Sequence, residues 1–490
     1  MRLAELIADL HGPKEVSGDA DISGVCIDSR RIAAGDLFVC LPGSRSDSHE
    51  FLDDAFQAGA AGAVVARREA FESLRIGGRA VVSVEDATDA CWRICKRFYK
   101  DPSARMKMVG VTGTNGKTTV AWILDQLLRR SGMRSAYLGT LGVTLEDECL
   151  KTELTTPFPP EIYATLADIA DQGAQVAVME VSSHALAQKR VDGIEFDLGI
   201  FTNLSQDHLD FHSDLEEYFQ AKRRLFHSLP TSKEIVTVAN ADDEFGRRLL
   251  AEAAQPVGFG SNECDMRLLD AEASVDSLRF SASWRGKRFD AHAPMGARFN
   301  VINCLAAITA AAALGVDPES SAGALASIRP APGRFESVPT GSDFSVIVDY
   351  AHTPDALEKL LASVRELGPR HVLTVFGCGG DRDRAKRPLM AKAVSERSDA
   401  VYLTSDNPRT EDPDRIVADA LPGVLSNVET HVNPDRAAAI RDAISEARSG
   451  DIVVIAGKGH EEYQILGTEK VPFDDRKVAA QAIAERLPCG

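Results

Sequence analysis

The sequence predicts an α/β protein with several domains, and three observations support this fold class. The chain has 490 residues, which is too long for a single hydrophobic core, so we expect about three domains. Short apolar runs alternate with stretches of helical periodicity along most of the chain. In the last third, the apolar runs have glycine and polar residues at their C-terminal ends, which is typical of a doubly wound parallel sheet with a site at that edge.

Composition and charge narrow the classes of function. Hydrophobic residues make up 44% of the chain and charged residues 26%, as in ordinary globular proteins. The net charge of −18 argues against nucleic acid as a partner, because binding a phosphate backbone requires an excess of Lys and Arg. No run approaches the roughly 20 apolar residues of a membrane-spanning helix, and the start MRLAELIADLHG has the pattern of an amphipathic helix. We therefore expect a cytoplasmic protein without a membrane span.

Cysteine usage agrees with that compartment. The nine cysteines are odd in number and scattered, which favours reduced thiols over a disulfide framework. Cys91 and Cys95 have helical spacing and no second pair at zinc-site distance, so we assign them to a buried helix face.

The chain is predicted to divide at two places. Residues 1–103 hold short β-type runs such as GDLFVCLPG and small-residue helical stretches such as AAGAVVARREA, and Asp101 and Pro102 then interrupt regular structure. A second boundary is predicted within RPAPGRFESVPTGSD, where prolines and glycines occur together. The expected domains are therefore residues 1–103, 104–334 and 335–490.

The middle domain begins with a strand, a glycine-rich turn and a helix. We expect the strand to end at Val111, and a further strand, VAVMEVSSH, to end near Glu180. The helix between them is predicted to have one apolar face, formed by Val120, Ile123, Leu124, Leu127 and Leu128. Gly132 is predicted to end this helix.

The last domain contains four apolar runs that alternate with helical stretches. These runs are FSVIVDYAH, HVLTVFGCGG, AVYLTSDNPR and DIVVIAGKGH. Because ligands bind outside the carboxyl ends of parallel strands, we expect the four loops that follow them to form one site.

The turn GTNGKTT, residues 113–119, predicts a phosphate site. Its glycines let backbone N–H groups converge on an anion at the start of a helix. Lys117 would reach the β- and γ-phosphates, and Thr118 would hold Mg²⁺. Val111 stands where the general motif has its first glycine.

This variant of the turn is similar to the loop of the Mur ligases and of folylpolyglutamate synthase, which join amino acids to a carboxylate using ATP. Further segments resemble, in order, the Mur ligases that add the third residue of the peptidoglycan stem peptide. They are IDSRRIAAGDLFV, MEVSSHALAQKRV, FTNLSQDHLDFH, EEYFQAKRRLF, GARFNVIN, GRFE, DYAHTPD, GCGGDRDRAKRPLM, SDNPRTEDP and AGKGHEEYQ.

The resemblance covers almost the whole chain and implies the three-domain Mur ligase architecture. An N-terminal domain would bind a UDP-linked substrate, a central P-loop ATPase-like domain would bind ATP, and a C-terminal Rossmann-like domain would bind an amino acid. The implied reaction adds meso-diaminopimelate to UDP-N-acetylmuramoyl-L-alanyl-D-glutamate through an acyl phosphate, with ATP and Mg²⁺. We expect the enzyme to be a monomer.

The resemblance also implies roles for individual residues. The catalytic residues would be Lys117, Glu180, His208 and Lys222. The metal ions would be held by Thr118, Glu180, His208 and a carbamylated Lys222. ATP would contact Gly113, Thr114, Asn115, Gly116, Lys117, Thr118, Thr119, Asn300, Asn303, Arg334 and Asp349. The UDP-linked substrate would contact Ile27, Ser29, Ser44, Arg45, Ser46, Thr155, Thr156, Ser182, Gln188 and Arg190.

The loop SDNPR points to the incoming amine. Arg409 offers a planar fork that matches a carboxylate, and Asp406 and Asn407 can recognise an ammonium group. The resemblance implies that D-N-P-R selects meso-diaminopimelate, whereas lysine-adding relatives lack this arginine. The implied amino-acid contacts are Arg382, Asp406, Asn407, Pro408, Arg409, Gly457 and Glu461.

Three alternatives remain open at this point. A folylpolyglutamate synthase shares the phosphate loop and the domain order, but it gives no reason for DNPR or for the N-terminal domain. A lysine-adding homologue would keep the reaction and change the amine. An ATP-dependent switch would leave the four C-terminal loops unexplained, and it would not turn over ATP in response to an amino acid.

Overall fold

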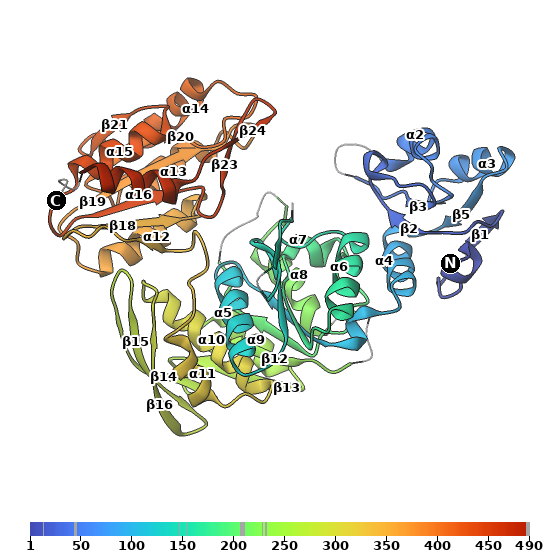
Figure 1. Cartoon of the computed structure of the whole chain (residues 1–490), viewed down its shortest axis with the longest axis horizontal. Helices are drawn as coiled ribbons and strands as arrows, with labels where there is room; N and C mark the ends of the chain where they lie inside the picture. The colour runs from blue at the N-terminus through green and yellow to red at the C-terminus, as the bar shows by residue number, and fades with distance from the viewer. Residues whose placement is uncertain are drawn as a thin grey trace.

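The computed structural model describes residues 1–12, 14–43, 47–146, 148–152, 154–205, 211–227, 229–230 and 233–486. Within these residues, three large sheets follow one another along the chain. In Figure 1 the N-terminal sheet (blue) and the C-terminal sheet (orange and red) lie apart from each other, on either side of the central one. The predicted boundaries after residues 103 and 334 fall between these sheets.

The first sheet has the strand order β1-β5-β4-β3-β2, with only β1 antiparallel to its neighbour. Its strands are β1 (Lys14–Ser17), β2 (Gly24–Cys26), β3 (Asp36–Val39), β4 (Gly62–Val65) and β5 (Ala80–Val84). The helices are α1 (Leu3–Leu6), η1 (Ser29–Arg31), η2 (Ser48–Phe51), α2 (Leu52–Gln57), α3 (Arg68–Ile76) and α4 (Ala87–Phe98).

The structure bears on two expectations about this region. The amphipathic start forms a helix of only four residues, and Lys14 Nζ then donates to the carbonyl oxygens of Ile7 (2.6 Å) and Leu10 (3.3 Å). Cys91 and Cys95 are free thiols on the buried face of α4, as the helical spacing predicted.

The central sheet has eleven strands in the order β16-β15-β14-β13-β12-β11-β6-β10-β7-β8-β9. Its strands are β6 (Lys107–Thr112), β7 (Ser135–Gly139), β8 (Gly142–Leu145), β9 (Glu148–Leu150), β10 (Val176–Glu180), β11 (Leu198–Phe201), β12 (Val236–Asn240), β13 (Gln255–Gly260), β14 (Met266–Ala273), β15 (Leu278–Trp284) and β16 (Lys287–Ala293). The helices are η3 (Pro102–Arg105), α5 (Lys117–Arg130), α6 (Pro159–Asp171), α7 (Ser183–Ala187), α8 (Leu215–His227), α9 (Glu244–Glu252), α10 (Phe299–Ala313) and α11 (Pro318–Leu325).

Two hydrophobic layers cover the faces of this central sheet. Helices α5, α10 and α11 pack on one face, while α6, α8 and α9 pack on the other. The predicted apolar positions of α5 are at most 1% exposed, and Gly132 follows the helix with a φ of +88° that favours glycine. β10 ends at Glu180 as expected, and β6 continues one residue past Val111.

The C-terminal sheet confirms the predicted doubly wound parallel topology. Its order is β17-β18-β22-β19-β20-β21, and β17 alone is antiparallel. The strands, with a separate hairpin of β23 and β24, are β17 (Glu336–Val338), β18 (Ser345–Asp349), β19 (Val372–Cys378), β20 (Ala400–Ser405), β21 (Glu429–Val432), β22 (Ile452–Ala456), β23 (Tyr463–Leu466) and β24 (Glu469–Pro472). The helices are α12 (Pro354–Glu366), α13 (Lys386–Ser395), α14 (Pro413–Ala420), η4 (Leu421–Gly423), α15 (Arg436–Glu446) and α16 (Asp475–Arg486).

Helices cover both faces of this sheet, with α12, α13 and α14 on one side and α15 and α16 on the other. The four predicted strands, β18, β22, β19 and β20, are neighbours and run parallel, so the loops after them lie at one edge. Among the residues described here, none of the helices combines the length and the apolar character that crossing a bilayer requires.

A buried ion pair joins the ends of two of these strands. Arg436, the first residue of α15, donates from Nε (2.8 Å) and Nη2 (2.7 Å) to the two carboxylate oxygens of Asp475, and neither side chain is exposed. Arg436 also donates to the carbonyl oxygens of Ser405 (3.4 Å) and Ala456 (3.0 Å), the last residues of β20 and β22. The pair therefore fixes the distance between two loops of the predicted site.

Breaking this pair should destabilise the protein, because it leaves a buried guanidinium without its counter-charge. We expect Asp475→Asn to cost about 3–5 kcal/mol of stability and to lower the thermal transition measured by scanning calorimetry. Lys477→Ala removes a neighbouring, exposed charge and serves as the control. Equal transitions for the two variants would contradict the structural role of the pair.

Candidate active site

The loop between β6 and α5 has the backbone shape that an anion site needs. Gly113 and Gly116 have φ angles of +145° and +86°, and Gly116 caps the first turn of α5. A Cβ atom on Gly116 would lie 2.5 Å from Asn303 Oδ1, so α10 can approach the loop only because residue 116 is glycine. Asn303 in turn donates to Asn300 Oδ1 (2.8 Å), so Asn303 lies against the loop and Asn300 lies behind Asn303.

The segment after β11 braces the same loop. Thr114 N donates to Asn203 O (2.9 Å), and Thr202 Oγ1 donates to Asn115 O (2.6 Å). Ser205 N donates to Thr114 Oγ1 (3.0 Å). The loop is thus held by polar contacts from outside, while Thr119 is buried in the first turn of α5.

Two lysines from different helices meet at this loop. Lys117 Nζ donates to the carbonyl oxygens of Gly113 (2.9 Å) and Thr114 (2.9 Å). Lys222 of α8 is 1% exposed, donates to the Gly113 carbonyl (2.8 Å) and lies 4.3 Å from the centre of the Tyr218 ring. Both Nζ atoms therefore meet at the Gly113 carbonyl, and the Lys117 ammonium places positive charge at this loop of an otherwise acidic protein.

The Glu180 carboxylate lies beside the phosphate loop and has no exposed surface. Its Oε2 atom accepts hydrogen bonds from the hydroxyls of Thr118 (2.9 Å) and Thr140 (3.2 Å). Its Oε1 atom accepts from Tyr137 OH (2.5 Å) and Thr140 N (2.9 Å). Burial, together with the Glu180 charge, raises the pKa of Tyr137 well above its usual range, so this phenol stays protonated and donates. The Thr140 hydroxyl also contacts Thr155 Oγ1 (3.1 Å).

A second hydrogen-bond network connects four residues that are predicted to bind the UDP-linked substrate. Thr156 Oγ1 donates to the Glu180 backbone carbonyl (2.8 Å) and accepts from Ser182 N (3.1 Å). Arg190 donates to Thr156 O (2.7 Å) and to Gln188 Oε1 (2.6 Å from Nη2). Burial lowers the pKa of Arg190 to about 10, so its guanidinium remains charged at neutral pH.

The N-terminal candidates stand apart from these groups. Ile27 follows β2 and Ser29 begins η1. Within the described part of the chain, no hydrogen bond or ion pair connects either residue with the central candidates. Four further predicted residues lie outside the described residues, namely Ser44, Arg45, Ser46 and His208.

The connection to the C-terminal sheet contributes two more candidates. Arg334 Nη2 donates to Thr118 Oγ1 (3.3 Å), and its guanidinium lies 4.6 Å from the centre of the Tyr350 ring. Asp349, at the end of β18, accepts from the backbone N–H groups of Phe335 (2.7 Å) and Ala351 (2.8 Å), and burial raises its pKa. Arg334 therefore reaches the phosphate loop from the segment that leads into the C-terminal sheet.

Two polar contacts link the central and C-terminal parts nearby. Lys359 Nζ of α12 donates to Ser205 Oγ (2.6 Å), next to the phosphate loop. Lys151 Nζ pairs with Glu462 (2.5 Å), next to the predicted contact Glu461.

The loop after β20 holds Asn407 in one orientation. Asn407 Oδ1 accepts from Lys458 Nζ (3.0 Å) and from Ile465 N (3.0 Å), which fills both of its acceptor positions. Asn407 Nδ2 donates one hydrogen to Glu461 Oε2 (3.0 Å). The amide keeps one further N–H donor in this orientation, and an N–H donor suits a carboxylate. The Asp406 and Glu461 carboxylates lie beside it, and Lys458 Nζ pairs with both of them, at 3.8 Å and 2.9 Å.

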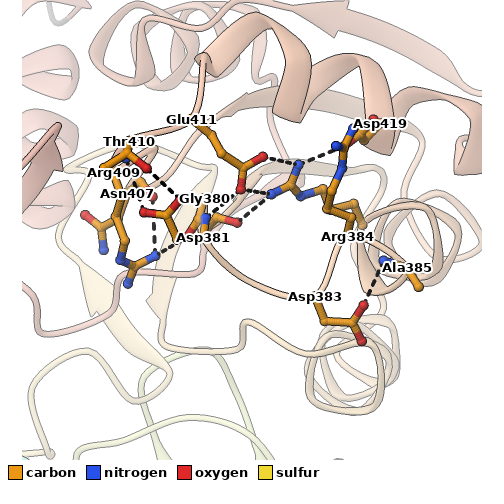
Figure 2. Close-up of polar contacts among 12 residues, drawn as sticks. Gly380, Asp381, Asp383, Arg384, Ala385, Asn407, Arg409, Thr410, Glu411 and Asp419 are labelled. Atoms are coloured by element: carbon orange, nitrogen blue, oxygen red, sulfur yellow. Dashed lines mark hydrogen bonds and ion pairs between the residues drawn. The ribbon is translucent and has the colours of Figure 1, made fainter. Parts of the chain in front are cut away.

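Glycine and proline shape the rest of this edge. Gly457 has a φ of +117°, and a Cβ atom there would lie 2.7 Å from the Asp406 carboxylate. Arg409 has a φ of +51°, a strained conformation for a residue with a side chain, and its Nη1 donates to the Gly380 carbonyl (2.7 Å), as Figure 2 shows. The exposed Arg382 lies in the loop after β19, and Pro408 packs its carbonyl against Gly380.

Four residues of the site were not predicted. Tyr137 and Thr140 hold Glu180, and Lys458, with no exposed surface, ion-pairs with Glu461 (2.9 Å). The His460 ring lies tilted against the Tyr350 ring, with the ring centres 5.1 Å apart, and burial lowers the pKa of His460 to about 4, so it is neutral at pH 7. Lys458 and His460 lie inside the motif AGKGHEEYQ and could have been found there, whereas no pattern marks Tyr137 or Thr140.

Known proteins resemble this chain along its whole length. Three family descriptions match in order: "Mur ligase family, catalytic domain" at residues 21–99, "Mur ligase middle domain" at 111–311 and "Mur ligase, glutamate ligase domain" at 333–459. A protein of Solibacter usitatus (strain Ellin6076) named UDP-N-acetylmuramoyl-L-alanyl-D-glutamate–2,6-diaminopimelate ligase is 44% identical, over 99% of this chain and 98% of its own length.

Solved structures agree with these matches. A structure described as a UDP-N-acetylmuramoyl-L-alanyl-D-glutamate–2,6-diaminopimelate ligase is 32% identical, with a TM-score of 0.66 and 95% of each chain covered. The folylpolyglutamate synthase of Mycobacterium tuberculosis shares the fold at 19% identity and a TM-score of 0.60, covering 75% of this chain and 92% of its own. From the family matches and the near-complete coverage of its relatives, the chain belongs to the Mur ligase family.

Proposed function

We propose that this protein uses ATP to join meso-diaminopimelate to UDP-N-acetylmuramoyl-L-alanyl-D-glutamate. The name of the 44% identical relative supports the reaction. The observation that carries the choice of amine is the loop after β20, where Asn407 and Arg409 offer N–H donors beside the Glu461 carboxylate. A substrate with a carboxylate and an ammonium group on one carbon matches that set of donors and acceptors.

The first chemical step activates a carboxylate. The glutamate carboxylate of the UDP-linked substrate attacks the γ-phosphorus of ATP, the bond to the β-phosphate oxygen breaks, and ADP and an acyl phosphate result. Lys117 and the N–H groups at the start of α5, from Gly116 to Thr119, would bind the phosphates, and Arg334 would add positive charge from the other side. Asn300, Asn303 and Asp349 complete the proposed ATP contacts.

Thr118 and Glu180 fit a magnesium ion. Both side chains offer oxygen, the ligand type that this hard cation prefers, and the two oxygens are 2.9 Å apart in a buried position. When bound, the ion would supply positive charge that offsets the repulsion between phosphoryl oxygens and the substrate carboxylate. We assign a second magnesium ion to His208 and a carbamylated Lys222.

The second step forms the amide bond. The amine of diaminopimelate attacks the acyl carbon, inorganic phosphate leaves with the bonding electron pair, and the amine loses a proton. At the end of diaminopimelate that does not react, Arg409 and Asn407 would hold the carboxylate. Asp406 and Glu461 would hold the ammonium group of that end. Lysine lacks that carboxylate, so it would leave the Arg409 guanidinium unpaired.

The proposal divides the work among three domains. Residues 1–103 would bind the UDP end through Ile27, Ser29, Ser44, Arg45 and Ser46. Residues 104–334 would bind ATP, and residues 335–490 would bind the amino acid. We place the enzyme in the cytoplasm, because ATP is supplied there and the eight cysteines within the described residues are free thiols. We also propose that it acts as a monomer.

The reaction is tested by phosphate release from ATP with the UDP-linked dipeptide and meso-diaminopimelate, lysine or no amine. We expect release that depends on diaminopimelate, with a tripeptide product of matching mass. Release with lysine alone would keep the ligase chemistry and refute the choice of amine. Phosphate release that is the same with and without either amine would refute the proposed function.

Arg409→Ala should weaken the use of diaminopimelate selectively. We expect kcat/KM for diaminopimelate to fall by about a hundredfold or more, because a charged, bidentate contact is lost. The KM values for ATP and the UDP-linked substrate should stay within about twofold. Arg415→Ala changes an exposed arginine of α14 and is the control. Equal losses for all three substrates would contradict the assignment.

Lys222→Arg separates the two roles that a buried lysine can play. Arginine keeps the positive charge but cannot form a carbamate, so we expect kcat to fall by about a hundredfold or more. With ¹³C-labelled bicarbonate, NMR should detect a carbamate carbon in the original protein and none in the variant. Lys233→Arg, at a surface lysine, is the control. An active Lys222→Arg variant would show that the ammonium form suffices.

A further inference from the structure

A buried arginine outside the predicted site lies behind the amino-acid loops. Arg387 of α13 is 1% exposed, and it donates to Glu411 through Nη1 (3.0 Å) and Nη2 (2.7 Å). Its Nη2 also reaches the Gly379 carbonyl (3.3 Å), and Nη1 reaches Asp419 (2.8 Å). Arg387 thus connects the loop after β19 with the loop after β20.

Glu411 extends this hydrogen-bond network to the backbone of Asp381. Its Oε1 atom, already paired with Arg387, accepts from Asp381 N (2.5 Å). Asp381 has a φ of +52°, and its carboxylate accepts from Thr410 Oγ1 (2.8 Å) and Thr410 N (3.3 Å). In Figure 2, Asp381 lies between Glu411 on one side and Arg409 and Thr410 on the other. Two residues on this path, Asp381 and Arg409, have strained backbones that the surrounding contacts must hold.

The path ends at the guanidinium of Arg409. Gly380 N donates to Asn407 O (2.9 Å), and the Gly380 carbonyl accepts from Arg409 Nη1 (2.7 Å). A Cβ atom on Gly379 would lie 3.1 Å from that same Nη1 atom, so the two glycines form the surface on which the guanidinium rests. Arg387 and Glu411 fix residues 379–381 on both sides of Gly380.

We propose that Arg387 and Glu411 are positioning residues that set the direction of Arg409 and thereby the preference for an amine with a second carboxylate. The inference rests on the proposed function and deepens it. Neither residue needs to touch the substrate. A guanidinium whose carbonyl partner is fixed loses less freedom when a carboxylate binds, which makes binding tighter.

Glu411→Gln tests the proposal because it removes the charge and keeps the size of the side chain. We expect KM for diaminopimelate to rise by about tenfold, while KM for ATP and for the UDP-linked substrate stays within about twofold. The control is Arg384→Gln, which removes an exposed ion pair to Asp419 and leaves Glu411 in place. An unchanged KM for diaminopimelate, or an equal rise for all three substrates, would overturn the proposal.

A double variant asks whether the effect passes through Arg409. In an Arg409→Ala background, Glu411→Gln should lower kcat/KM for diaminopimelate by less than about twofold further. A further full tenfold loss would show an independent, general effect and would overturn the proposal. If Glu411→Gln does not fold, Thr410→Val removes the exposed hydroxyl that contacts Asp381, and the same selective rise of about threefold is expected.

The same assays separate this inference from the proposed function. Failure of the original protein to use diaminopimelate would refute the function itself. Normal use of diaminopimelate, with KM unchanged in Glu411→Gln and Thr410→Val, would refute only the positioning role.

Discussion

A carboxylate without solvent contact is costly unless donors surround it, and the central site depends on how the chain meets that requirement at Glu180. Its four donors come from the first turn of α5, from Tyr137 in the middle of β7 and from Thr140 directly after β7. These donors fix the ends of β7 and β10 relative to the phosphate loop. Lys117 and Lys222 converge on the Gly113 carbonyl of that loop. Thr118, the residue after Lys117, donates to Glu180, so the lysines and this carboxylate belong to one site.

The amino-acid edge follows a different physical rule. Parallel strands place their following loops side by side, but adjacency alone gives loops no fixed shape. Here ionic and backbone contacts supply that shape: the Arg436 pair joins the ends of β20 and β22, and the Arg387 pair joins the loops after β19 and β20. Both arginines are almost fully buried, so each keeps its position only because carboxylates neutralise it.

Local periodicity was enough to predict α5, the end of β10 and the four parallel strands of the last sheet, because burial of an apolar face decides all of them. The same pattern at the start of the chain gives no end for α1, because the contacts of Lys14 with the carbonyl oxygens of Ile7 and Leu10 join residues outside the helix. Tyr137 and Thr140 could not be predicted, because their roles arise from strand order, which brings β7 beside β10. The orientation of Asn407 likewise depends on Lys458 and Ile465, which are distant in sequence.

The fixed amide of Asn407 has a consequence for the chemical durability of the protein. Asparagine side chains age by deamidation, in which the backbone nitrogen of the next residue attacks the side-chain carbonyl carbon and expels ammonia. The next residue here is Pro408, whose ring nitrogen has no hydrogen to lose. The amide is therefore shielded from this route to aspartate, a change that would replace its N–H donor with a negative charge.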